Sequence, residues 1–332
     1  MPLSALISLR GFGAYGPSNQ NTEDADIEVL EYLEKNGCLA RVVSIVHLEE
    51  LRNEVKALHT DRLLDEGFYH EWMVPRVDPK KARGMSKAKS IFVAAFPTPA
   101  TITKFHWAGQ TVELMVPPTY GNYVHVSNRL MKLLKEAFLP EKHWIARAVL
   151  PVKLLAARSG LAQYGKNNIT YIPKNGSFHT LAAVYTDFES PEDHWQEKVA
   201  LPKCEKCKAC TIACPTGAIS GDRFLIHVER CLTLYTEKAA SQPFPDWIPP
   251  SAHNSIIGCM RCQRVCPYDK EIIGWHRDSG EFSEKETAYL LKGNFSGAEA
   301  KALERKLKRV GLDLSVFPRN LEVHLRRMGL LQ

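Results

Sequence analysis

The feature that most constrains this chain is a run of four cysteines in its C-terminal half. It reads Cys204-Glu-Lys-Cys207-Lys-Ala-Cys210-Thr-Ile-Ala-Cys214-Pro215, which has the spacing CxxCxxCxxxCP. In bacterial ferredoxins, three cysteines of such a run bind one 4Fe-4S cluster, and the fourth cysteine, before the proline, binds a second cluster. The run therefore predicts a partner motif elsewhere in the chain.

The partner motif is present and lacks one cysteine. It reads Cys259-Met-Arg-Cys262-Gln-Arg-Val-Cys266-Pro267, and Cys231 upstream can supply the missing ligand. The crossover of two-cluster ferredoxins then predicts two ligand sets. The first set is Cys204, Cys207, Cys210 and Cys266, and the second set is Cys214, Cys231, Cys259 and Cys262.

Zinc is the alternative metal, because paired CxxC motifs also occur in zinc ribbons. A zinc site needs neither a third cysteine at two-residue spacing nor a proline after the last cysteine. The motif therefore favours two 4Fe-4S clusters, and the ninth cysteine, Cys38, is expected to be an ordinary thiol. Two adjacent clusters form a path for single electrons, so the residues before Cys204 are expected to hold the acceptor or the substrate.

The 332-residue length allows an α/β domain and a smaller module. We expect an α/β (α+β) fold with an α/β domain over 1–195, a ferredoxin-like double-cluster domain over 196–275, and a helical extension over 276–332 that packs on the core. Apolar periodicity and turn residues predict the individual elements. The expected helices are 24–37, 48–59, 123–138, 150–158, 284–291, 297–310 and 318–328, and the expected strands are 40–47, 90–96, and 168–171 with 178–187 as a hairpin or adjacent strands.

Composition adds little about partners. The net charge of +6 permits a polyanionic partner without requiring one. No apolar run approaches the roughly 20 residues of a membrane span, and residues 1–16 show no export signal. We therefore expect a cytoplasmic protein without a membrane partner. In the reducing cytoplasm, clustered cysteines indicate metal binding.

Three features resemble the epoxyqueuosine reductase family, whose superfamily includes the reductive dehalogenases. They are the block Ala156-Ala-Arg-Ser-Gly-Leu-Ala-Gln-Tyr-Gly-Lys166, the Gly176-Ser-Phe segment, and the order of the two cysteine runs around Cys231. The resemblance implies a nitroreductase-like domain that binds cobalamin base-off, with electrons passing through both clusters to the cobalamin. By the same resemblance, the residues around the cobalamin would be Gly160, Leu161, Tyr164, Gly165, Lys166, Asn167, Ser177, Thr233 and Thr236.

The chain departs from this family at one position. The family's catalytic aspartate is replaced by Ala146, and no Asp or Glu lies between Lys142 and Asp187. Reductive dehalogenases deliver the proton from a tyrosine with a basic neighbour, which makes other residues candidates by resemblance, although each can equally serve in packing. The catalytic candidates are Tyr164, Arg147 and Tyr120, and Tyr123 and His143 lie in the same part of the chain.

Three functions are compatible with these observations. The first is a cobalamin-dependent iron-sulfur reductase that acts on a small molecule. The second is an electron-transfer protein that activates a corrinoid partner protein, and the third is an epoxyqueuosine reductase that acts on tRNA with a relocated proton donor. Each requires an external low-potential electron donor of the ferredoxin or flavodoxin type. The basic helices expected at 301–309 and 319–327 could contact an RNA backbone or simply face solvent.

Overall fold

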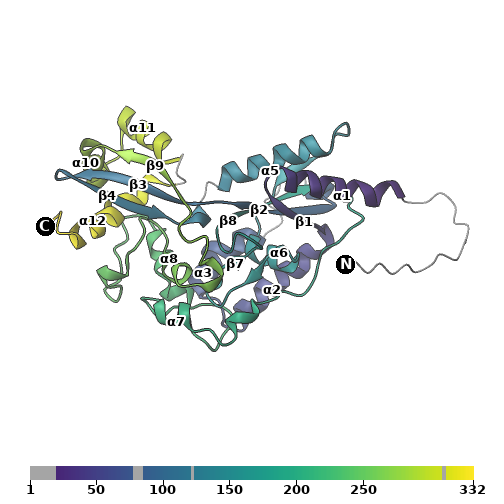
Figure 1. The fold of residues 1–332 in the computed structure, drawn as a ribbon, viewed down its shortest axis with the longest axis horizontal. Helices are drawn as coiled ribbons and strands as arrows, with labels where there is room; N and C mark the ends of the chain where they lie inside the picture. The colour runs from purple at the N-terminus through teal and green to yellow at the C-terminus, as the bar shows by residue number, and fades with distance from the viewer. Residues whose placement is uncertain (1–19, 78–84, 121–122, 309–311) are drawn as a thin grey trace, which may run out of the picture.

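The structure is a computed structural model, and it describes residues 20–77, 85–120, 123–308 and 312–332 (Figure 1). The expectation about residues 1–16 therefore lies outside the described residues. None of the described helices combines the length and the apolar character of a membrane-spanning segment.

A four-stranded antiparallel sheet forms the core of the N-terminal part. Its strands, in spatial order, are β1 (Leu39–Ser44), β2 (Ser90–Pro97), β8 (His179–Thr186) and β5 (Ile145–Arg147). Helices cover both faces, so β2 and β8 are buried on both sides rather than alternating between core and solvent. Apolar residues of α2 (Leu48–Thr60) and α6 (Val152–Arg158) pack on one face, and those of α1 (Gln20–Lys35) and α5 (Tyr123–Ala137) pack on the other.

A second sheet joins the end of this domain to the C-terminal residues. Its order is β4 (Gln110–Val116), β3 (Ala100–Trp107) and β9 (His276–Phe282), with β3 antiparallel to β4 and parallel to β9. Apolar residues of α10 (Glu284–Lys292), α11 (Gly297–Lys308) and α12 (Phe317–Arg327) pack against it. These three helices agree with the predicted ranges, whereas none of the three strands was predicted.

The cysteine-rich segment consists of short helices and turns. Each cysteine run forms one helix, α7 (Ala209–Ala213) or α9 (Arg261–Arg264), and these two helices pack together. Cys231 precedes α8 (Leu232–Thr236). Figure 1 shows α7 and α8 beneath the place where the two sheets meet.

Residues 168–171 and 178–187 were expected to form a hairpin or two adjacent strands. Both segments contain a strand, but the hairpin alternative is wrong, because the two strands do not pair with each other. The strand β7 (Thr170–Tyr171) pairs with β6 (Gln163–Tyr164), and β8 pairs with β2 and β5 instead. The chain reverses between Ile172 and Gly176, whose backbone groups bond to each other, and Gly176 has a φ of 50°. Ser177 then bonds to Asp269 of the cysteine-rich segment, so the turn anchors that segment and does not continue a two-stranded ladder.

Candidate functional site

The seven cysteines of the two runs and Cys231 lie around two separate cavities. A small surface pocket is lined by Cys204, Cys207, Cys210 and Cys266. A larger cavity is lined by Cys214, Cys231, Cys259 and Cys262. These are the two groups into which the ferredoxin crossover divides the cysteines. Cys38 lies apart from them, buried in the core beneath α1.

The spacing of the sulfur atoms distinguishes an iron-sulfur cluster from zinc. Among the described residues, the one group of three or more His, Cys, Asp or Glu whose ligand atoms all lie within 4.8 Å of one another contains no cysteine. Sulfur atoms about 2.3 Å from a tetrahedral zinc would lie about 3.8 Å apart. The described cysteines are therefore spread wider than a single zinc ion requires.

The buried thiols of the second group lose their protons less readily than free cysteines. Burial raises the pKa of Cys231 to about 11, and it raises the pKa of Cys262 well above its usual value, with the neighbouring thiols adding to both effects. Such groups become thiolates only beside a metal centre that compensates their charge. The amide N–H of Ala218 and the Asn254 side chain donate to the sulfur atoms of Cys214 and Cys259, at 3.3 and 3.1 Å. Hydrogen bonds of this kind tune cluster potentials.

The larger cavity lies between the α/β domain and the cysteine-rich segment and has a volume of about 480 Å³. One wall comes from α6, β7 and β8. A second comes from the helical segment formed by α3 (Glu66–Phe68), a π-helical turn (Tyr69–Met73) and α4 (Val74–Val77). The third wall contains α8 and the second group of cysteines. A group bound in this cavity would thus lie beside the second cluster.

Several polar side chains of the cavity wall have unused bonding capacity. Trp72 Nε1 and Asn168 Nδ2 are buried donors without a hydrogen-bond partner in the described part of the chain. His179, also on the wall, has partners for both ring nitrogens: Nε2 contacts Thr170 Oγ1 at 3.0 Å, and Nδ1 contacts the Gly176 carbonyl at 3.2 Å. Burial lowers the pKa of His179 to about 4, so its ring is neutral near pH 7. Orphaned buried donors are rare in proteins, and a bound ligand with acceptor atoms would satisfy them.

The cavity wall also contains a carboxyl group that sequence reasoning missed. Glu237, directly after α8, is the one Asp or Glu among the described residues that line the cavity. The hydroxyl group of Tyr120 donates a hydrogen bond to Glu237 Oε1. No motif marks this glutamate, because its place beside the cavity depends on how distant segments pack together.

Three of the residues that the sequence suggested for catalysis or cofactor binding line this cavity, namely Tyr120, Asn167 and Thr233. Lys166 lines the small pocket, where its ammonium group donates to the Cys207 carbonyl at 2.9 Å, and Asn167 contacts both cavities. The remaining predicted cofactor residues do not line the larger cavity. They are Gly160, Leu161, Tyr164, Gly165, Ser177 and Thr236.

The other catalytic candidates also lie away from the cavity. Tyr164 is buried against Phe224, and Arg147 donates to Asn128 Oδ1 at 2.9 Å from β5. Ala146 lies in the same strand. His143 bonds to Asp187 at 3.0 Å. The side chain of Tyr123 lies outside the described residues.

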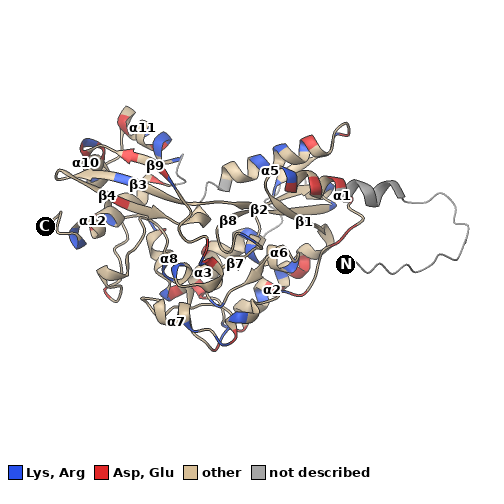
Figure 2. Cartoon of the chain, viewed as in Figure 1, with Lys and Arg blue, Asp and Glu red and all other residues tan. Residues whose placement is uncertain are grey.

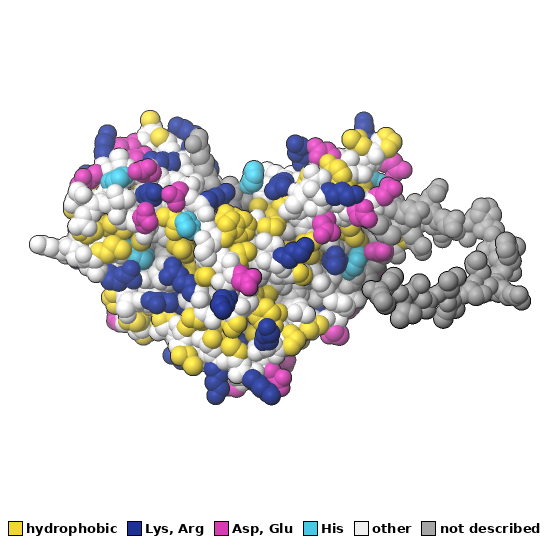
Figure 3. Space-filling model, in the orientation of Figure 1, with side chains coloured by type: hydrophobic (Ala, Val, Ile, Leu, Met, Phe, Trp, Pro, Cys, Tyr) yellow, Lys and Arg dark blue, Asp and Glu magenta, His cyan; other side chains and the backbone are white. Residues whose placement is uncertain are grey.

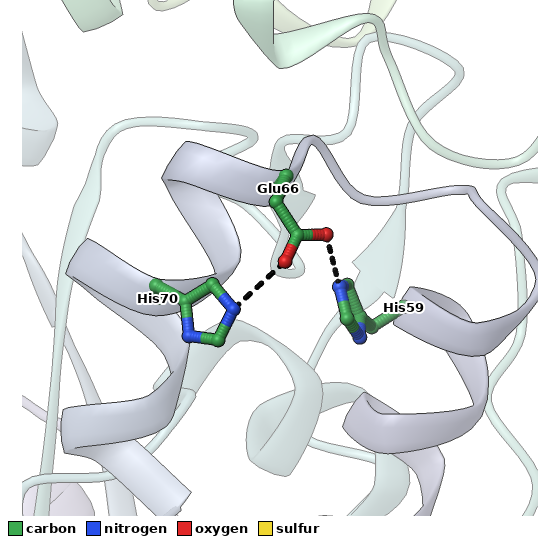
Figure 4. Close-up of side chains that lie close together, drawn as sticks. All are labelled: His59, Glu66 and His70. Carbon is green, nitrogen blue, oxygen red and sulfur yellow. Dashed lines mark hydrogen bonds and ion pairs between the residues drawn. The ribbon is translucent and has the colours of Figure 1, made fainter.

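A cluster of His59, Glu66 and His70 lies on the surface, where α2 meets the next helix (Figure 4). The two histidines contact opposite oxygens of the carboxylate, at 2.7 and 2.8 Å. The three side chains could bind a metal ion, but the two hydrogen bonds already satisfy the carboxylate. The cluster therefore serves to connect the two helices.

Comparison with known proteins agrees with this architecture. Residues 203–269 match the protein family described as a 4Fe-4S double cluster binding domain, and this span contains the seven cysteines of the two runs and Cys231. The curated epoxyqueuosine reductase of Cellulophaga algicola is 26% identical over 59% of this chain and 67% of its own length, and that of Bacillus subtilis is 29% identical over 61% and 53%. The chain is similar to epoxyqueuosine reductases.

Solved epoxyqueuosine reductases share the fold of this chain. The enzyme from Streptococcus thermophilus matches 91% of this chain and 81% of its own, with a TM-score of 0.64 and 19% identity. A structure from Bacillus subtilis matches 92% and 82%, with a TM-score of 0.64 and 22% identity. The predicted mixed α/β fold with a double-cluster domain is confirmed. An alignment with another curated epoxyqueuosine reductase, from Salmonella typhimurium, is 30% identical and spans 47% of this chain and only 40% of that protein.

Proposed function

We propose that this protein is a cobalamin-dependent iron-sulfur oxidoreductase. The observation that carries the proposal is the shared cavity: residues of the α/β domain and the four cysteines assigned to the second cluster line the same space. An electron that reaches this cluster would need no further protein carrier to reach a group in the cavity. The curated relatives are named as epoxyqueuosine reductases, which are oxidoreductases.

The cavity has the donors and the apolar surface that a corrinoid requires. Trp72, Asn168 and Thr233 would hold its polar edge, and two of these side chains have donors without a protein partner. Leu64, Phe68 and other apolar side chains of the wall would exclude water. The bound cobalamin would supply the low-potential reducing chemistry, while the protein positions the substrate and supplies the proton.

The small pocket offers a place for the external electron donor. Lys203, Lys206 and Lys208 are exposed beside the first group of cysteines, and Ile212 of α7 is 81% exposed. Figure 2 shows Lys and Arg near α7, and Figure 3 shows basic and hydrophobic side chains together on this part of the surface. Such a surface is complementary to an acidic ferredoxin or flavodoxin.

We infer that the substrate is a small molecule. One solved epoxyqueuosine reductase is described in complex with a tRNA stem loop. In this chain, the basic residues of α12 have internal partners: Arg319 donates to the carbonyl groups of Tyr235 and Lys238, and Arg327 donates to that of His253. These arginines support the cysteine-rich segment, which leaves α12 poorly suited to phosphate binding.

Anaerobic purification with added cobalamin tests the proposal. We expect about eight iron atoms, about one cobalt atom and the spectrum of base-off cobalamin in each chain. Clusters without cobalt, together with tight binding to a corrinoid protein, would favour the electron-transfer alternative. Salt-sensitive binding of an anticodon stem-loop would favour tRNA as the substrate.

A further inference from the structure

Glu237 occupies a fixed position on the cavity wall. It follows α8, six residues after Cys231 in the chain. The backbone on both sides of it is held by α12: Arg319 Nη2 donates to the Tyr235 and Lys238 carbonyls at 2.7 and 2.9 Å, and Asn320 Nδ2 donates to the Thr236 carbonyl at 2.9 Å. Functional groups are best held in position by such supporting bonds.

Tyr120 reaches Glu237 because a glycine lies beneath its ring. A Cβ atom on Gly258 would lie 2.5 Å from Tyr120 Cε2, and Gly258 has a φ of 72°, which favours glycine. The close approach brings the hydroxyl group to Glu237 Oε1, where it donates a hydrogen bond. The contact joins the α/β domain to the segment that contains the second group of cysteines.

Charged side chains surround the carboxyl group of Glu237 and influence its protonation. Lys153, Arg76 and the Tyr120 hydroxyl favour the ionised form of Glu237, whereas Glu71 opposes it. Burial has the largest effect and raises the pKa of Glu237. Lys153 lies on the α6 wall, where its ammonium group donates to the Asn168 carbonyl at 3.1 Å. The cavity therefore contains one acid that retains its proton more readily than a surface glutamate.

We infer that Glu237 is the catalytic acid of this cavity, with Tyr120 as its positioning residue, in place of the aspartate replaced by Ala146. The inference rests on the proposed reductase function. In the step that we assign, a carbon–heteroatom bond of the substrate breaks, and its electron pair leaves with the heteroatom. A carbon–hydrogen bond forms from two electrons and the Glu237 proton. The electrons arrive singly from a ferredoxin or flavodoxin through the clusters, and water reprotonates the Glu237 carboxylate.

Infrared spectroscopy tests the stored proton without a substrate. The full chain with both clusters should show a protonated carboxyl band that persists to higher pH than the bands of exposed glutamates. This band should disappear in Glu237→Gln and shift in Tyr120→Phe, which lacks the hydrogen bond. The control Glu34→Gln removes an exposed carboxylate of α1, outside the cavity lining, and should keep the band. Equal iron content in all variants shows that folding is intact. A spectrum unchanged by Glu237→Gln would overturn the inference.

Kinetics with reduced methyl viologen and styrene oxide test proton delivery in the cobalamin-loaded protein. We expect kcat to fall at least about 100-fold in Glu237→Gln, with a smaller change in KM, and to recover partly in Glu237→Asp. Cluster reduction by viologen should keep its rate. A Glu237→Gln variant with unchanged kcat would overturn the assignment. A wild-type protein that binds no cobalamin refutes the proposed function instead, and the infrared band then decides alone whether Glu237 stores the proton.

Discussion

Replacement of Asn320 should remove the second cluster while leaving the first cluster in place. Asn320 is buried in α12, and its amide donates to the carbonyls of Thr236 and Ile256 at 2.9 and 2.8 Å. These carbonyls lie in the two segments that contain Cys231 and Cys259. Loss of both bonds leaves two buried acceptors unsatisfied, at about 1–3 kcal/mol each, so Asn320→Ala should cost about 2–6 kcal/mol. That is a large share of a typical domain stability of about 5–15 kcal/mol.

Iron analysis and EPR after anaerobic reconstitution measure the effect. Asn320→Ala should lower the iron content from about eight to about four atoms per chain. Asn320→Asp should be worse than Asn320→Ala, because it directs a carboxylate oxygen at two carbonyl oxygens. Arg326→Ala is the matched control, since Arg326 belongs to the same helix and pairs with exposed Glu322 at 2.8 Å. Full iron content and an unchanged melting temperature in Asn320→Ala would refute this account of α12.

Three further predictions concern the donor surface, the second core and pH. The double variant Lys206→Glu, Lys208→Glu should slow reduction by flavodoxin at least about tenfold at low salt and leave reduction by dithionite unchanged; a difference that persists in high salt would contradict the electrostatic explanation. Phe317→Ala, at a fully buried site between two other phenylalanines, should destabilise the protein by about 3–5 kcal/mol in chemical denaturation, and a loss below about 1 kcal/mol would contradict the packing argument. Hydrogen bonds from its two histidine partners lower the pKa of Glu66, so its stabilisation is present above the unfolded-state pKa and disappears as pH falls through the folded-state value. Thermal unfolding of Glu66→Gln should therefore differ from wild type near neutral pH and converge with it in acid.

The sequence predicted the cysteine-rich segment and the C-terminal helices better than the second sheet. Cluster ligands follow each other at short, fixed spacings, so local sequence is sufficient to recognise them. The strand β9, with the sequence HRDSGEF, is polar and mostly exposed, and it pairs with β3 from a distant part of the chain. Neither its composition nor its neighbours predict a strand. Pairing of this kind becomes visible only when the tertiary structure is known.

The residues that line the cavity are likewise brought together from distant parts of the chain. Tyr120 was identified as a candidate for its residue type and its place in the chain, whereas its partner Glu237 lies 117 positions away. The block Ala156–Lys166 carried the family resemblance. Two of its residues pack within the α/β domain: Leu161 belongs to the hydrophobic core, and Tyr164 pairs with β7. Resemblance can identify a shared framework. It cannot show which side chains line a cavity.

The position of the proposed acid has a consequence for how the cavity operates. Ala146 lies in β5, which pairs with the buried strand β8. An acidic residue at position 146 would therefore belong to the four-stranded sheet of the α/β domain. Glu237 instead belongs to the short segment that begins at Cys231, and α12 fixes both flanks of this segment. The group that gives the proton and a ligand of the cluster that gives the electron are then parts of one rigid unit. Proton and electron would reach the substrate from the same wall, and the opposite walls would be free to differ according to the substrate.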